Sequence, residues 1–152
     1  MQIVTDWHAD LIDVGKLVLA YTLALPVGWY REQEAHSIGV RTFPLVAMAS
    51  CGYVLLALPL GVTDAAAQSR VIQGLVAGIG FIGGGAILKA EGNVHGTATA
   101  ASIWTTGVVG VAVAHNRFLL AALLAGLNLF SLRVLFPLKQ RLDGRKQQGD
   151  RD

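Results

Sequence analysis

The sequence predicts an all-α membrane protein with five transmembrane helices, and its composition and charge distribution carry this prediction. Hydrophobic residues make up 53% of the 152 residues and charged residues only 14%, whereas a soluble domain has about 25% charged residues. The charges are also clustered, which leaves residues 42–63, 71–88 and 92–116 without any. Uncharged apolar stretches of about 18 residues or more are typical of membrane-spanning helices.

We expect one transmembrane domain, residues 1–138, followed by a polar tail at residues 139–152. The fourth helix is close to the lower limit of about 17 residues for a span. The short turn after it leaves room only for an antiparallel hairpin with the fifth. The five expected helices cover residues 11–30, 42–61, 71–88, 98–114 and 118–138.

The first helix must include charged residues in order to span. Residues 17–30 are uncharged but too few to cross about 30 Å of hydrocarbon, so the helix must take in Asp13 and Lys16. A spacing of three puts both on one helix face, where they can form an ion pair. The pair then lies either at the outer interface or, as an intramembrane polar site, inside the bundle.

Basic residues predict the orientation. Two of them, Arg70 and Arg117, fall on the side of the N-terminus, which has no Lys or Arg before Lys16 and so does not resemble a cleaved signal peptide. Cytoplasmic segments carry the excess of basic residues, so we expect a cytoplasmic C-terminus and an external N-terminus. The eight basic residues of the predicted cytoplasmic side are Arg31, Arg41, Lys89, Lys139, Arg141, Arg145, Lys146 and Arg151.

The glycine-rich stretch "GLVAGIGFIGGGAIL", residues 74–88, contains the spacing G-x-G-x-x-G. This spacing indicates a dinucleotide site only between a strand and a helix, with an acidic residue about 20 positions further on. Here it lies in an uncharged apolar run, and Glu91 follows too early. Because small residues let membrane helices approach closely, we expect a packing role and a central position for the third helix, against small residues of the fourth that include Gly107 and Gly110. The predicted packing glycines are Gly74, Gly78, Gly80, Gly83 and Gly84.

The sequence shows no catalytic, cofactor-binding or metal-binding constellation. Its four histidines fall in separate segments, and Cys51 is the single cysteine, so neither metal-ligand spacing nor a disulfide is predicted. Ser102 has no base placed near it, and Asn128 is expected to form a hydrogen bond between helices. The basic excess lies in the tail, which does not indicate nucleic-acid binding. We therefore expect a protein that is not an enzyme.

Three ordered stretches resemble the MgtC/SapB family of bacterial inner-membrane proteins. They are "GWYREQEAHSIGVRT" (residues 28–42), "RVIQGLVAGIGFIGGGAIL" (70–88) and "GNVHGTATAASIW" (92–104). The resemblance implies five transmembrane helices and a cytoplasmic C-terminus. Longer members carry a C-terminal ACT-like domain, which we do not expect here. Matching positions expected to be functional are Arg31, Glu32, Arg41, Thr42, Asn93, Thr99 and Trp104.

The resemblance also implies a function. Family members act in adaptation to magnesium limitation or acid stress, and in some pathogens in virulence, through survival inside macrophages. The leading hypothesis is a non-enzymatic regulator that contacts another integral membrane protein, such as the F-type ATP synthase. Arg31, Glu32 and Arg41 would then form a cytoplasmic patch that recognises a partner or orders residues 89–99.

The alternative is a small ion or magnesium transporter. Asp13, Lys16, Arg31 and Arg41 would line its path through the membrane. Five helices are few for a pore, so this hypothesis requires a homo-oligomer.

Overall fold

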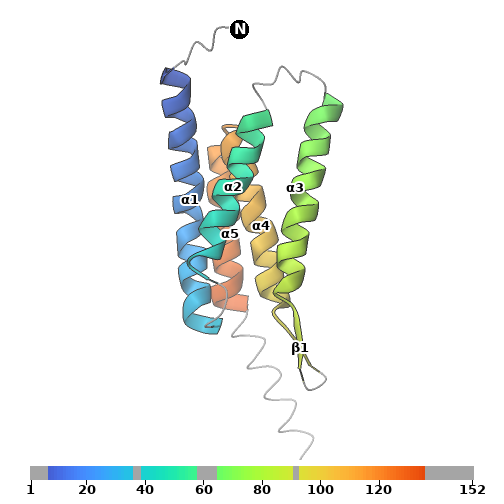
Figure 1. Ribbon diagram of the computed structural model, residues 1–152. Helices are drawn as coiled ribbons and strands as arrows, with labels where there is room; N and C mark the ends of the chain where they lie inside the picture. Colours follow the sequence, from blue (N-terminus) through green and yellow to red (C-terminus); the bar gives the residue numbers. More distant parts are fainter. Residues whose placement is uncertain (1–6, 36–38, 58–64, 91–92, 136–152) are drawn as a thin grey trace, which may run out of the picture.

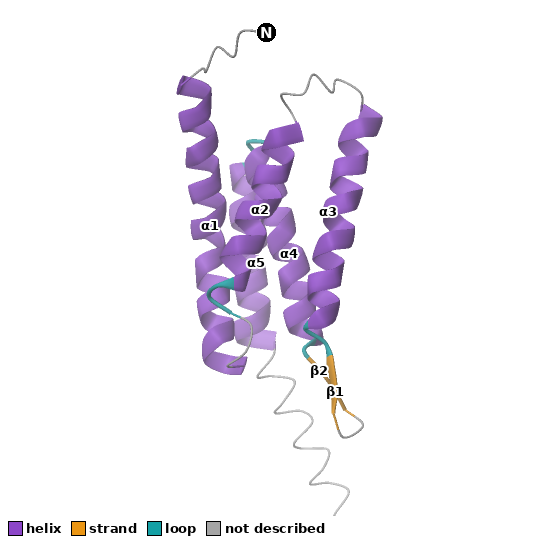
Figure 2. Ribbon diagram, viewed as in Figure 1, coloured by secondary structure: helices purple, strands orange, loops and turns teal. Residues whose placement is uncertain are grey.

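The computed structural model describes residues 7–35, 39–57, 65–90 and 93–135, which form a bundle of five α-helices with one short hairpin (Figure 1). The strands β1 (Leu88–Ala90) and β2 (Asn93–His95) pair antiparallel, with Leu88 opposite His95 (Figure 2). A π-helical turn, Ser131–Leu135, extends the last helix. The helices are α1 (Trp7–Ala35), α2 (Thr42–Ala57), α3 (Ala65–Gly85), α4 (Thr97–Ala114) and α5 (Phe118–Phe130).

Successive helices run in opposite directions along the bundle (Figure 1). The β-hairpin, the end of α1 and the start of α2 therefore lie at one end, and the α4–α5 turn lies at the other. Helix α1 continues through Pro26 in its interior. It is longer than the 20 residues expected, because it extends over charged residues at both ends.

Helix α4, rather than α3, is the centre of the bundle. It contacts all four other helices, whereas α3 contacts α4 and, less closely, α2. The predicted central position of the third helix is therefore wrong. Two glycines of α4 explain the close packing: a Cβ at Gly110 would lie 2.1 Å from the carbonyl oxygen of Ala47, and one at Gly107 would lie 2.1 Å from Cδ1 of Ile79.

The third helix ends earlier than predicted. It stops at Gly85 rather than at residue 88, and the N–H groups of Ala86 and Ile87 bond to the carbonyls of Gly83 and Gly84. Consecutive glycines have low helix propensity, which explains why the helix ends in this run. The chain then enters β1, a strand that the apolar pattern does not predict.

Many large apolar side chains lie on the outside of the bundle, and small ones predominate inside. Trp29, Tyr53, Phe81 and Leu119 are all more than half exposed, while alanine and valine dominate the core. An apolar outer surface of this extent indicates contact with lipid or protein rather than with water. By length and composition alone, two described helices could cross a membrane, Trp7–Gln33 and Thr97–Ala114.

Candidate functional site

A buried arginine connects two of the family-like stretches. Arg31, in the last turns of α1, is only 6% exposed, and its Nη2 donates a hydrogen bond to the hydroxyl of Thr99 in the first turn of α4. Thr99 is itself 5% exposed. A buried cation is retained only where polar partners compensate its lost hydration. This bond therefore ties α1 to α4 through two residues that are 68 positions apart in sequence.

The neighbouring Glu32 holds the connection between α1 and α2. Its Oε2 accepts a hydrogen bond of 3.0 Å from the N–H of Val40. Gly39 lies so close that a Cβ there would be 2.7 Å from the Cα of Glu32. A Cβ at Gly28 would lie 3.1 Å from the carbonyl oxygen of Gly39. The two glycines thus permit an approach of the loop to α1 that larger residues would prevent.

The stretch 92–104 enters α4 through a tight turn at Gly96. Gly96 has φ +86°, a left-handed conformation that favours glycine. A Cβ there would lie 2.0 Å from the carbonyl oxygen of Ala86. The end of α3 and the start of α4 are therefore held together, with Gly83 beside Ala100. We call the set Gly28, Arg31, Glu32, Gly39, Gly83, Gly96 and Thr99 the motif junction.

The structure does not bring all of the predicted site residues together. Arg31 bonds to Thr99, and Glu32, the next residue of α1, bonds to Val40, whereas Arg41 is exposed just before α2. Arg31 and Arg41 therefore do not form one exposed patch, because Arg31 points into the bundle. The remaining predicted positions are Thr42 at the start of α2, Asn93 in β2 and Trp104 on the outer surface of α4.

The structure contains the ion pair expected within α1. Nζ of Lys16 lies 3.6 Å from Oδ1 of Asp13, with Lys16 13% exposed and Asp13 42% exposed. Fifteen residues of helix, about 22 Å at 1.5 Å per residue, separate Lys16 from Arg31. The pair and the motif junction are therefore two separate polar sites.

Four of the predicted packing glycines contact no neighbouring helix. Within the described part of the chain, a Cβ at Gly74, Gly78, Gly80 or Gly84 would meet no atom within 4 Å outside its own local helix. The expected packing is found for Gly83, where a Cβ would lie 3.3 Å from the carbonyl oxygen of Ala100. These four glycines lack such contacts because α3 lies at the edge of the bundle and turns one face to α4.

We expect Gly83→Leu to lower the free energy of unfolding by about 2 kcal/mol, a typical cost of overpacking. The added side chain would push α3 away from the backbone of Ala100. Denaturant unfolding of the purified protein in detergent measures the effect. Ala122→Leu, at an exposed position of α5, is the matched control. Equal stability of both variants would contradict a packing role for Gly83.

The α4–α5 contact contains the interhelical hydrogen bond expected for Asn128. The hydroxyl of Ser102 donates to Oδ1 of Asn128 over 2.7 Å, and Nδ2 of Asn128 donates to the carbonyl of Ser102 over 3.2 Å. Both side chains are buried. Ser102 is thus engaged in packing two helices. Among the described residues, no three His, Cys, Asp or Glu side chains gather in a way that could hold a metal ion.

Comparison with known proteins identifies relatives across most of the chain. The MgtC family model matches residues 17–141. An uncharacterised protein of Haemophilus influenzae is 32% identical over 148 residues, covering 91% of this chain and 61% of that protein. YhiD of Escherichia coli K12, provisionally named a magnesium transporter, is 30% identical over 134 residues. The match covers 84% of this chain and 62% of YhiD.

A third relative is the Salmonella typhimurium LT2 protein MgtC. It is 31% identical over 102 residues, which cover 67% of this chain and 43% of that protein. The chain thus spans about three fifths of the length of the first curated relatives that it matches. No solved structure matches it.

Proposed function

Because this chain belongs to the MgtC family, we propose that it is a five-span protein of the bacterial inner membrane that acts without catalysis, by contact with another membrane protein. Its role would be adaptation to magnesium limitation or acid stress. The family and the two apolar helices are consistent with a membrane location. The expected partner class is an integral membrane complex such as the F-type ATP synthase.

The observation that carries this proposal is the motif junction. A bond between Arg31 and Thr99, a loop held on Glu32 and a turn at Gly96 brace three segments at one end of the bundle. The residues of the motif junction fix the shape of that end of the bundle. Arg41, two positions after Gly39, remains exposed there. A rigid surface with an exposed arginine suits recognition of a carboxylate on a partner, because the planar guanidinium binds both oxygens.

The orientation is tested by reporter fusions. We expect a reporter placed after Arg145 to read as cytoplasmic, and one placed after Asp6 to read as external. The bundle is consistent with this expectation. Among the described residues, Arg31, Arg41 and Lys89 lie at the end that carries the β-hairpin, and Arg70 and Arg117 lie at the opposite end (Figure 1). The reverse pattern would move the motif junction to the outside and contradict the proposal.

Arg41 is the residue to test for partner recognition. In a deletion strain at low magnesium, we expect Arg41→Ala and Arg41→Lys both to lose growth at matched membrane levels, because lysine lacks the planar fork. The folded fraction should remain unchanged, since Arg41 is exposed. Full growth with lysine but not with alanine would show that only the positive charge of Arg41 matters. Full growth with both variants would contradict any functional role of Arg41.

The name of YhiD supports a second candidate, an oligomeric magnesium or ion transporter. The Lys16–Asp13 pair would then belong to its path. Flux of magnesium and protons into liposomes containing the purified protein separates the two functions. The regulator predicts no flux above that of empty liposomes, and robust flux would favour the transporter.

A further inference from the structure

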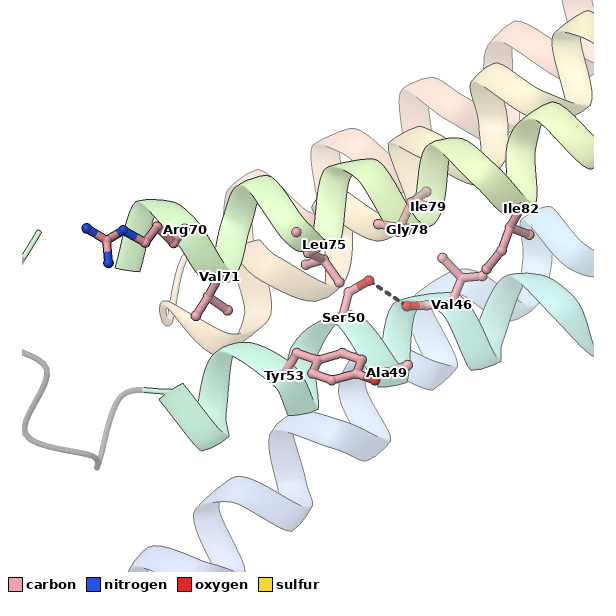
Figure 3. A pocket seen from close by; sticks show the side chains of 11 residues that line it. Val46, Ala49, Ser50, Tyr53, Arg70, Val71, Leu75, Gly78, Ile79 and Ile82 are labelled. Atoms are coloured by element: carbon pink, nitrogen blue, oxygen red, sulfur yellow. Dashed lines mark hydrogen bonds between the residues drawn. The ribbon is translucent and has the colours of Figure 1, made fainter. Parts of the chain in front are cut away.

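A groove runs between α2 and α3 on the side away from α1 (Figure 3). Its volume is about 530 Å³, within the range of small-molecule sites. Tyr53 and Ile82 line it and are themselves exposed, so the groove opens to the outside of the bundle. Apolar side chains and glycines supply most of the lining, which comprises Val46, Ala49, Ser50, Tyr53, Arg70, Val71, Gly74, Leu75, Gly78, Ile79 and Ile82.

The charge of the groove is confined to one end. Arg70 lies in the second turn of α3, and its guanidinium points away from the apolar stretch (Figure 3). Tyr53 of α2 lies near the same end, while Gly78 and Ile82 line the far part. Ser50 directs its hydroxyl to the carbonyl of Val46 in its own helix. The groove therefore presents a cationic mouth and a long apolar interior.

We propose that this groove binds one acyl chain of an anionic phospholipid, with the lipid phosphate at Arg70. From Arg70 to Ile82 the groove extends about 18 Å at 1.5 Å per residue, slightly more than half of a hydrocarbon core about 30 Å thick. That length matches one leaflet. The inference requires the membrane placement proposed above, but it goes beyond the regulatory function.

Binding of an acyl chain would also explain the two glycines of the groove, which pack against no neighbouring helix. Gly74 and Gly78 line the groove, and a Cβ at either position would meet no described atom within 4 Å outside the local helix. Without side chains, they leave room for hydrocarbon against the backbone of α3. A larger residue at either position would occupy the volume intended for the acyl chain.

The experiment is lipid competition on the purified full-length chain, read by native mass spectrometry. Phosphatidylglycerol and phosphatidylcholine with the same acyl chains are added in equal amounts. We expect the protein to favour phosphatidylglycerol about fivefold, since one arginine near a lipid surface contributes about 1 kcal/mol. Arg70→Gln should abolish this preference. Arg117→Gln, in the exposed α4–α5 turn at the same end of the bundle as Arg70, should keep the preference.

Variants that fill the groove give an independent result. Gly78→Leu and Gly74→Leu should each reduce the retention of both lipids, whereas Gly126→Leu, at an open position of α5, should not. Size-exclusion chromatography confirms that each variant is folded. Equal loss of preference with Arg70→Gln and Arg117→Gln, or unchanged retention in both filled variants, would overturn the proposal.

A change of oligomeric state in the filled variants, with lipid retention unchanged, would assign the groove to a second copy of the chain and also overturn the proposal. Growth at low magnesium is a separate measurement. The lipid site and the regulatory function can therefore fail independently.

Discussion

Gly110→Ala is expected to lower the free energy of unfolding by about 3 kcal/mol, the upper end of the usual cost of overpacking. The new methyl group would lie 2.1 Å from the carbonyl oxygen of Ala47 and 2.9 Å from Cβ of Ser50. The first of these atoms belongs to the backbone, so α2 and α4 must move apart as whole helices. Because α4 contacts every other helix, this displacement reaches the entire bundle.

The matched control is Gly126→Ala. A Cβ at Gly126 of α5 would meet nothing within 4 Å, so the change should stabilise the protein slightly, by up to about 1 kcal/mol of helix propensity. Denaturant unfolding in one detergent measures both variants. Similar stability of the two would show that α2 and α4 do not approach through Gly110.

A second large loss in the free energy of unfolding is expected for Thr99→Val. Valine keeps the shape of threonine but removes the oxygen that accepts the bond from Arg31. A hydrogen bond to a charged group contributes about 1.5–3 kcal/mol, and we expect a loss near the top of this range because both residues are buried. The end of α1 would lose its connection to α4, so growth at low magnesium should fall as well.

Two further variants separate the hydrogen bond from general packing. Thr99→Ser keeps a hydroxyl and should retain most of the stability and growth. Thr105→Val removes a hydroxyl that bonds only to the carbonyl of Ala101 in its own helix, and it should change stability by less than about 0.5 kcal/mol. If Thr99→Val matches Thr105→Val in stability and growth, the Arg31–Thr99 bond contributes little to either.

Local patterns in the sequence predict the helices and several of their polar contacts. Uncharged stretches identify five helices, and the start of α2 at Thr42 agrees with the expected boundary. The pair of Asp13 and Lys16 follows from a spacing of three on one helix. The family assignment likewise rests on short ordered motifs, and the match over residues 17–141 confirms it.

The arrangement of the helices depends on contacts that hydropathy does not encode. An apolar side chain can face lipid or a neighbouring helix at similar cost, so the pattern along α3 does not show which of its faces is packed. Gly83 contacts α4 and Gly78 contacts no other helix, although both belong to one glycine-rich run.

The same limit applies to the charged residues of the predicted site. Arg31 and Arg41 lie ten positions apart in one motif with the same charge, and nothing local distinguishes them. In the folded bundle Arg31 is buried and bonds to Thr99 of α4, while Arg41 stays exposed. Helix positions therefore follow from polarity along the chain, whereas burial of a given arginine depends on a partner 68 residues away.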